Sequence, residues 1–545
     1  GGSEGYGIRG SGNVPLIDDS LAMTLSGFFR HDPGVVDDPS RGKSDVDSAD
    51  VWGARVSLLG QLTERFSARI SATFQSTDGD GSSNVFSTNT RGLTAGLTQD
   101  YIAGTGGYER KVLQLDATLN YDLDWAQLTS ITGYGDSKFE DVSDVTSFLG
   151  FLTEEATGRD DLGSITFLPS QTKKFSQELR LASHSGDKLE WLFGAFYTDE
   201  DSDTQYNIYA SNPNTGALLM SVYPDTFPST FQERAVFGAA TYHFTDRFDI
   251  QVGARASRNE QYYEETIGGP LNVPPYYVQA TSRDNSTTYL FSPRFRLLSD
   301  AIVYGRFATG YRPGGPNPGA GFGTPAEYGA DTTLSYEVGV KSDFLERRVS
   351  LDASVYSIDW QDIQLQQRDP VTQLAYYSNA GKARSRGADL TALAAPARGM
   401  QIAASLSYND AQLSQAFAGN LYGRAGDRLP FSAQWSGSLA LDQELDLSSQ
   451  YTAFFGGTAT YLGARSGSFP PRATVSRVRV PSFTTLDLRA GVRTEGWTFS
   501  LFVRNATDAR GILGAAPEVA SGATGLYLLN VMRPRTIGLS VANEF

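Results

Sequence analysis

The stretch TLDLRAGVR, residues 485–493, alternates strictly between apolar side chains and polar or small ones. The residues on its apolar face are Leu486, Leu488, Ala490 and Val492. Because successive side chains of a β-strand point to opposite faces, this period of two predicts a strand with one apolar face. The same alternation recurs in RFDIQVGAR (247–255), RVSLDASV (348–355) and WTFSLFV (497–503). Helical spacing fails on all four stretches, so the sequence predicts an all-β fold.

The composition suits many such strands and excludes several classes of protein. The 545 residues include 27 tyrosines, 31 phenylalanines and 57 glycines, and the mean hydropathy is −0.30. No apolar run approaches the ~18 residues that a membrane-spanning helix needs. A net charge of −16 argues against a nucleic-acid partner, and the absence of cysteine excludes a disulfide scaffold and thiolate chemistry.

Short polar turns and long connections alternate along the chain. The ten short turns lie at residues 18–20, 63–65, 122–124, 185–187, 245–247, 299–300, 345–348, 396–399, 447–449 and 494–496. Between them lie longer connections rich in Gly, Pro, Asn, Asp and Ser, such as residues 79–107, 146–172 and 311–331. Short turns at one end and long loops at the other are typical of an outer-membrane β-barrel with periplasmic turns. We therefore predict one transmembrane antiparallel β-barrel domain over residues 1–545.

The strand count predicts that one strand of the barrel lies outside this chain. Ten hairpins supply twenty strands and residues 530–545 supply one more, which makes 21. Single-chain bacterial barrels have an even number of strands, because both chain ends lie on the periplasmic side. EGYGIRGSGNVPLI (4–17) should therefore be the second strand of a 22-strand barrel. We expect either an additional strand between residues 5–16 and 533–545 or direct pairing of those two segments.

A resemblance to one family adds to this architecture. ATGYRPGGPN (308–317) resembles a motif of TonB-dependent outer-membrane receptors, in which a strand runs into a long external loop. Further stretches that resemble the family, in its order, are LSYEVGVKSDF (334–344), YSIDWQDIQ (356–364), NAGKARSRGADL (379–390), FVRNATD (502–508) and RPRTIGLSVANEF (533–545). GSGNVPLIDDSLAMTLSGFFR (10–30) resembles the second and third strands of the same barrel. The final Phe545 resembles the C-terminal signal that directs bacterial barrels to insertion.

The resemblance implies a 22-stranded barrel with an N-terminal plug, in the outer membrane of a Gram-negative bacterium. Such receptors import scarce, bulky solutes, mostly ferric siderophores, and the inner-membrane TonB complex supplies the energy through the plug. Neither a plug nor a TonB box is present in these 545 residues, which implies that the plug and first strand belong to a longer precursor or to a separate chain. The alternative is a passive, plugless channel or a structural barrel, although a passive porin normally has only about 16–18 strands.

Neither an enzyme nor a resident cofactor or metal is predicted. The three histidines, His31, His184 and His243, lack ligand spacing and leave little for a metal site or a Ser-His-Asp triad. TDEDSD (198–203) could hold Ca²⁺, but it lacks the spaced ligands and the glycine of a calcium loop. We interpret it as a solvated extension of a strand.

Candidate ligand contacts lie in the Gly/Pro-rich external loop that follows the GYRPGG motif. Tyrosine and arginine are enriched at recognition surfaces because they combine contact area with hydrogen bonds. The predicted contacts are Tyr311, Arg312, Asn317, Phe322 and Tyr328. The alternative is that these residues only fold the loop.

The KARSR segment (382–386) is a second candidate site. Counting from the apolar residues that follow it places Lys382, Arg384 and Arg386 on the outer face, where they could pair with lipopolysaccharide phosphates. A single β-bulge would instead turn them into the lumen, toward a plug, and the sequence leaves both alternatives open. Trp125, beside a tight turn, is the candidate for the periplasmic aromatic belt.

Overall fold

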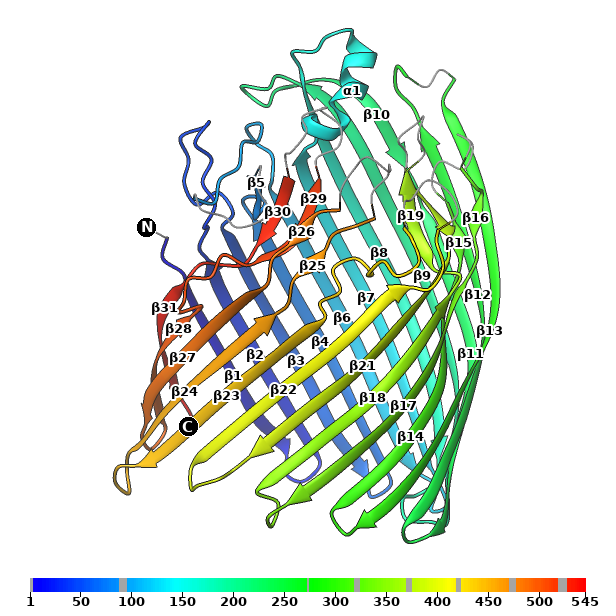
Figure 1. The fold of residues 1–545 in the computed structure, drawn as a ribbon, viewed down its shortest axis with the longest axis vertical. Helices are drawn as coiled ribbons and strands as arrows, with labels where there is room; N and C mark the ends of the chain where they lie inside the picture. The colour runs from blue at the N-terminus through cyan, green and yellow to red at the C-terminus, as the bar shows by residue number, and fades with distance from the viewer. Residues whose placement is uncertain are drawn as a thin grey trace.

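A wall of antiparallel strands makes up most of the molecule (Figure 1). The computed structural model describes residues 3–87, 96–271, 274–317, 324–368, 375–417, 423–469, 477–517 and 527–545. The wall strands are β1 (Tyr6–Ile17), β2 (Leu21–Asp32), β3 (Ala49–Thr63), β4 (Phe66–Gly79), β6 (Tyr108–Asp122), β7 (Gln127–Asp144), β8 (Gly163–Ala182), β9 (Leu189–Ser211), β10 (Leu218–Thr226), β11 (Ser229–Thr245), β12 (Phe248–Ile267), β13 (Tyr276–Leu298), β14 (Ala301–Arg312), β17 (Asp331–Phe344), β18 (Val349–Gln361), β21 (Lys382–Ala394), β22 (Met400–Leu413), β23 (Trp435–Asp446), β24 (Thr452–Leu462), β27 (Phe483–Arg493), β28 (Trp497–Arg504) and β31 (Thr536–Asn543).

The long connections carry short elements of their own at the upper end of the barrel in Figure 1, opposite the tight turns. They are α1 (Thr146–Thr157), β5 (Asn84–Ser87), β15 (Gly315–Pro316), β16 (Glu327–Tyr328), β19 (Gln364–Arg368), β20 (Ala375–Asn379), β25 (Arg465–Ser466), β26 (Arg479–Val480), β29 (Ile512–Pro517) and β30 (Tyr527–Val531). Within the described ranges, no helix combines the length and the hydropathy that crossing a membrane would require.

The wall contains 21 crossings, in agreement with the count from the turns. The sheet has 22 labelled strands, but β10 and β11 are two halves of one descending crossing. Both halves pair with β9, β11 with its lower part and β10 with its upper part. The break between them holds Pro228, which has no backbone N–H to give to the ladder. Each of the ten predicted turns joins two neighbouring wall strands.

The alternation of residues 485–493 separates a lipid face from a lumenal face. On β27 the outward Leu488 is 43% exposed, whereas the inward Arg489 forms an ion pair of 2.6 Å with Asp442 of β23. On β31 the outward Leu539 is 79% exposed. Water would penalise such an apolar outer surface, whereas bilayer hydrocarbon favours it. The structure therefore confirms a transmembrane β-barrel.

Aromatic residues gather at the end of the barrel that carries the tight turns. Trp125 is 62% exposed beside the turn between β6 and β7, and its ring centroid lies 6.1 Å from that of Trp191. Phe193 continues the group, 5.5 Å from Trp191. This position matches the one predicted for Trp125.

The wall is open along one seam, between β1 and β31. Among the described residues, β1 forms its ladder with β2 alone and β31 with β28 alone. Neither arrangement expected for residues 5–16 and 533–545 is therefore present in the described ranges, where no strand lies between these segments and they form no ladder with each other. Direct pairing was the wrong alternative because both strands run toward the tight turns, and an antiparallel ladder needs opposite directions.

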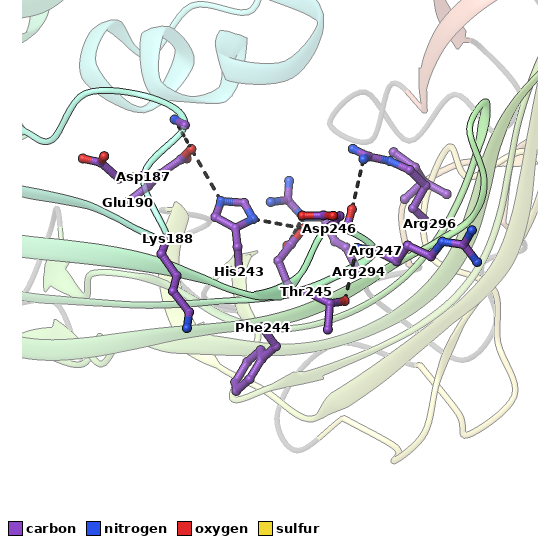
Figure 2. Close-up of a pocket in the computed structure, with 13 residues that line it drawn as sticks. Asp187, Lys188, Glu190, His243, Phe244, Thr245, Asp246, Arg247, Arg294 and Arg296 are labelled. Atoms are coloured by element: carbon purple, nitrogen blue, oxygen red, sulfur yellow. Dashed lines mark hydrogen bonds and ion pairs between the residues drawn. The ribbon is translucent and has the colours of Figure 1, made fainter.

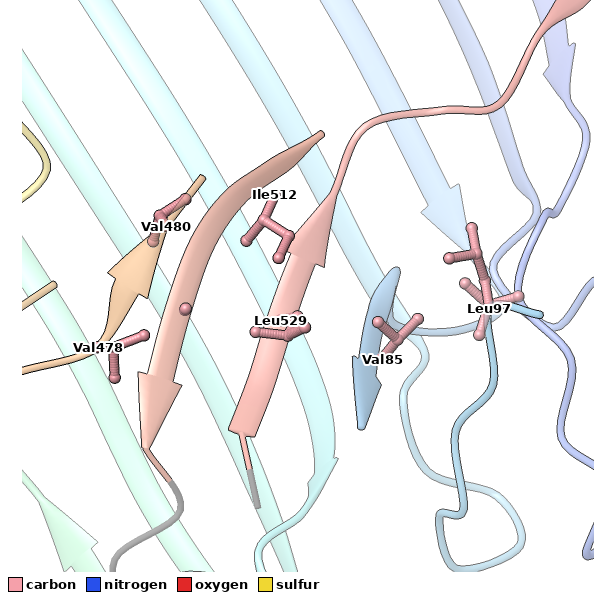
Figure 3. Close-up of a cluster of buried hydrophobic side chains, with 8 residues drawn as sticks. Val85, Leu97, Val478, Val480, Ile512 and Leu529 are labelled. Carbon is pink, nitrogen blue, oxygen red and sulfur yellow. The ribbon is translucent and has the colours of Figure 1, made fainter. Parts of the chain in front are cut away.

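The long connections bridge this seam at the loop end. β30 pairs with β5, which joins the connection after β28 to the connection after β4. Buried apolar side chains from four connections pack around this ladder (Figure 3). They are Val36, Val85, Leu97, Val478, Val480, Ile512, Ala515 and Leu529. Each such large side chain contributes about 1.5–3 kcal/mol of burial free energy, so the bridge is a core of its own.

Candidate functional site

An ion pair stands where β14 leaves the wall. Arg312, the last residue of β14, lies directly opposite Asp331, the first residue of β17, and their side chains form an ion pair. The Asp331 side chain is only 4% exposed, whereas that of Arg312 is 51% exposed. The guanidinium also lies 5.8 Å from the ring centroid of Trp360. Arg312 therefore neutralises a buried carboxylate and still presents an open face to the lumen.

Gln364 joins the connection after β18 to this ion pair through hydrogen bonds. Its backbone N–H donates to Asp331 Oδ2 at 3.2 Å. Its side-chain Nε2 donates to the carbonyl oxygens of Pro313 at 2.8 Å and Gly329 at 3.1 Å. Asn379 makes a parallel contact by donating to the carbonyl oxygens of Gly329 and Asp362. The connections after β14 and β18 are thus held together by amide side chains that satisfy backbone groups.

Asn317 adds further hydrogen bonds between the connections after β14 and β18, and we call this contact the clamp. Its side chain is fully buried, and Nδ2 donates to the carbonyl oxygens of Pro325 at 3.1 Å and Tyr377 at 2.8 Å. Its Oδ1 accepts the backbone N–H of Tyr377 at 2.7 Å. The side-chain amide bonds both backbone groups of Tyr377, as a neighbouring strand of a β-ladder would. Because the side chain is fully buried, a ligand could not contact it. For Asn317, the alternative that it only folds the loop fits the structure.

The other predicted contacts divide between two sides of the loop. Tyr328 is half-buried and its ring centroid lies 5.2 Å from that of Tyr377, so this aromatic pair lies on the same loops as Arg312. Tyr311 points the other way, and its buried hydroxyl lies near Ser257 on the inner face of β12. Phe322 lies outside the described residues. The structure thus groups Arg312, Asn317 and Tyr328 and separates Tyr311 from them.

The sequence did not predict four further residues of this cluster. Asp331, Trp360, Gln364 and Tyr377 come from two further strands and a second connection. No local spacing links them to the GYRPGG motif, because only the wall register brings them level with Arg312.

A row of tyrosines and carboxylates crosses the wall higher up, where β10 joins β12. Tyr206, Asp225, Ile267 and Tyr276 lie opposite one another on successive strands, and Glu265 lies one step below. Asp225 is 6% exposed, and its Oδ1 has no hydrogen-bond partner among the described residues. Burial, followed by repulsion from Glu265, raises the pKa of Asp225 to about 8. Burial also raises the pKa values of Tyr223 and Tyr263, which face the same cluster.

Asp225→Asn should remove a pH dependence from this upper ladder. A carboxyl whose folded pKa of about 8 exceeds its unfolded value of 3.8 stabilises the ladder at low pH. That stability is lost progressively as pH rises toward 8, so amide exchange in β10, corrected for its intrinsic pH dependence, should accelerate over that range. The Asp225→Asn variant should show a flat profile. Asp201→Asn, at an exposed carboxylate on β9, is the control, and an equal slope in both variants would contradict the assignment.

A charged cavity of about 590 Å³ lies at the opposite end, beside the tight turns (Figure 2). His243 lies between two carboxylates, with Nε2 3.5 Å from Glu190 Oε1 and Nδ1 3.8 Å from Asp249 Oδ2. Arg294 Nε lies 2.6 Å from Asp249 Oδ1. In the described part of the chain, no group of three or more His, Cys, Asp or Glu residues could hold a metal ion. The cavity offers fixed charges of both signs, which suits a polar polypeptide segment better than an apolar solute.

The KARSR segment lies on the outer face of β21. Its ladders with β18 and β22 run without a register shift, so no bulge turns the segment inward. Ala388 of the same face lies opposite Val355, which is 59% exposed on the lipid side. Arg384 forms an ion pair with Asp359, and Arg386 lies opposite Asp410. The basic side chains, with Lys382 at the upper end, therefore face outward. Asp359 compensates Arg384, whereas the Asp410 carboxylate forms its ion pair with Arg428.

The family model described as "TonB dependent receptor-like, beta-barrel" matches residues 51–506, most of this wall. The chain belongs to that family. As a TonB-dependent receptor-like barrel, it is 26% identical over 405 residues to the pesticin receptor of Yersinia pestis. That alignment covers 70% of this chain and 53% of the relative, so the chain spans about half the length of the curated relatives it matches first.

Solved structures share the fold of this TonB-dependent receptor-like barrel. The crystal structure of the ferric yersiniabactin uptake receptor FyuA from Yersinia pestis superposes with a TM-score of 0.82 at 20% identity, covering 99% of this chain and 79% of that one. The siderophore receptor PiuA from Acinetobacter baumannii gives a TM-score of 0.78 at 17% identity, with 99% and 80% coverage. At these identities the likeness concerns the fold alone.

Proposed function

We propose that this chain forms the barrel of an outer-membrane importer of a bulky, scarce solute, most simply a ferric siderophore, in a Gram-negative bacterium. The observation that carries the proposal is the family match over residues 51–506, on a wall of 21 crossings. A barrel of about 22 strands encloses a lumen wide enough to need a plug. The names of the relatives point the same way, since FyuA is a ferric yersiniabactin uptake receptor and PiuA a siderophore receptor.

An ascending strand from outside these 545 residues would complete the wall, and we propose that it comes together with a plug. β1 and β31 both descend, and each has one unpaired edge among the described residues. One ascending strand satisfies both edges in antiparallel ladders, and unpaired N–H and C=O groups in lipid are costly. The charged cavity near His243 supports a lumenal polypeptide, because it offers fixed partners of both signs at the tight-turn end. The TonB complex would act on that plug.

The solute would meet the barrel at the clamp of the two connections. Arg312 has an open guanidinium face, and Tyr328 with Tyr377 supplies a ring pair beside it. A guanidinium suits the anionic oxygens of an iron chelate, and aromatic rings suit its organic frame. Tyr311 and the buried Asn317 would act behind this surface by fixing the loop, and Phe322 remains a predicted contact.

Uptake by the full-length protein tests the importer. In a Gram-negative host without receptors of its own for the probe, the protein should support uptake of at least one of ferric yersiniabactin, ferric preacinetobactin and ferric citrate. Deleting the TonB gene of that host should reduce uptake to background, because the energy comes from the inner membrane. Uptake that persists without TonB would favour the alternative of a passive channel, and failure with every iron chelate would favour a different solute or a structural barrel.

A further inference from the structure

Two arginines face each other on the outside of the wall. Arg234 of β11 and Arg258 of β12 are direct cross-strand partners, and both are exposed. They lie on the same face as the lipid-exposed Val236 and Val252, which are 62% and 47% exposed. Like charges directly opposite on antiparallel strands destabilise the pair, so this arrangement calls for a compensating anion.

The described protein side chains do not supply that anion. Among the residues that the structure describes, neither Arg234 nor Arg258 forms an ion pair, whereas Arg283 on the next strand pairs with Glu260 at 2.7 Å. Glu260 lies within electrostatic reach of all three arginines and is already bonded to one of them. Asp199, on the outer face of β9, forms no ion pair with Arg234 in the described part of the chain. The patch therefore keeps an excess of positive charge.

The height of the pair matches the boundary between hydrocarbon and headgroups. Arg234 and Arg258 stand about eleven residues above the turn at 246–247, which at ~3.3 Å per residue and a ~40° tilt is roughly 28 Å. The apolar band of an outer-membrane barrel is about 25 Å tall, and an aromatic girdle lies at its edge. The Arg234 guanidinium lies 5.9 Å from the ring centroid of Tyr197, an aromatic residue of that outer face. Both guanidiniums thus stand at headgroup level in the outer leaflet.

We propose that Arg234 and Arg258 together bind a phosphate group of an outer-leaflet lipopolysaccharide. Two planar guanidiniums on adjacent strands can hold one phosphate by charge-assisted hydrogen bonds, which converts their mutual repulsion into a shared attraction. The KARSR segment differs in this respect, because neither of its arginines lies opposite another arginine. Arg384 pairs with Asp359, and Arg386 lies opposite Ser357 and Asp410. The site depends on the outer wall alone, whatever solute the barrel imports.

Binding of defined lipids by the purified full-length protein tests this site. The protein, stripped of lipopolysaccharide in a non-ionic detergent, is titrated with diphosphoryl lipid A, with dephosphorylated lipid A of the same acyl chains, and with inorganic phosphate. Diphosphoryl lipid A should bind most tightly, and Arg234→Gln/Arg258→Gln should weaken it about tenfold, in line with two lost charge-assisted contacts. Arg234→Lys/Arg258→Lys should keep most of the affinity, since it keeps the charge.

The matched control removes two arginines from the same height on another part of the wall. Arg384→Gln/Arg386→Gln should leave the affinity for diphosphoryl lipid A unchanged, because Arg384 is paired with Asp359 and neither residue has a second arginine directly opposite it. Three results would overturn the proposal: equal affinity of Arg234→Gln/Arg258→Gln and the unsubstituted protein, equal affinity for dephosphorylated lipid A, or a loss confined to the control. Binding of inorganic phosphate as tight as that of the lipid would make this a free-phosphate site. Heat-dependent gel migration shows that each variant is folded.

Discussion

Replacing Phe545 by serine should reduce the amount of this barrel in the outer membrane about tenfold while leaving the stability of the assembled barrel within ~0.5 kcal/mol. β31 ends at Asn543, and the Phe545 side chain is fully exposed, with no packing partner to lose among the described residues. Any large effect must therefore act before folding is complete, and we propose that it arises because the strand with Phe545 is then read as an insertion signal. Immunoblots of outer-membrane fractions, together with denaturant unfolding of purified protein, separate the two quantities.

The control for this prediction is Phe545→Tyr, which keeps an aromatic terminus and should insert normally. A Phe545→Ser barrel that reaches the membrane in normal amounts would remove the insertion role from this residue. A variant that inserts normally but unfolds at lower denaturant would show a structural role that the exposed side chain does not suggest.

Replacing Arg312 by glutamine should have the second largest effect, at the clamp between the connections after β14 and β18. The Asp331 carboxylate is almost fully buried and would lose its cationic partner, which costs about 2 kcal/mol and makes local opening about thirtyfold more frequent. The Gln364 amide, which donates to Asp331, should report this as faster hydrogen exchange. Affinity for the iron chelate that we propose as the cargo should fall in the same variant, because the ring pair of Tyr328 and Tyr377 shares the clamp.

A second substitution separates the lost charge from lost packing. Arg312→Gln/Asp331→Asn no longer buries an unpaired charge, so it should recover most of the exchange protection. Arg398→Gln is the matched control, since Arg398 pairs with Asp446 where both side chains are largely exposed, and it should change stability by less than about 0.5 kcal/mol. Equal exchange at Gln364 in the Arg312→Gln and Arg398→Gln variants would contradict the clamp.

The sequence predicted the class of fold because the information is local. Strict alternation, as in residues 485–493, can satisfy an apolar solvent on one face and a polar lumen on the other only as a strand. The count of 21 crossings followed from the short turns, since each hairpin needs one short polar segment between its two strands. For the KARSR segment the sequence left the outward and lumenal directions open, and only the uninterrupted register of β21 decided for the outward one.

The contacts between residues of different strands could not be predicted from such local patterns. The sequence named Arg312, Asn317 and Tyr328 as ligand contacts, but their partners Asp331, Gln364 and Tyr377 come from other strands and another connection. Asn317 was predicted as a ligand contact, but its side chain is buried and bonded to Pro325 of its own loop and Tyr377 of the second loop. The open seam and the β5–β30 bridge across it likewise depend on segments more than 400 residues apart.

The sequence by itself thus determined the strands, their two faces, their number and the family, because alternation, turn chemistry and motifs are properties of neighbouring residues. The tertiary structure alone decided which residues meet. Arg234 lies opposite Arg258, Arg312 opposite Asp331, and Asp225 above Glu265, because hydrogen-bonded register fixes partners across strands. A shift of one residue would have sent every one of these side chains to the other face, and no local pattern encodes that choice.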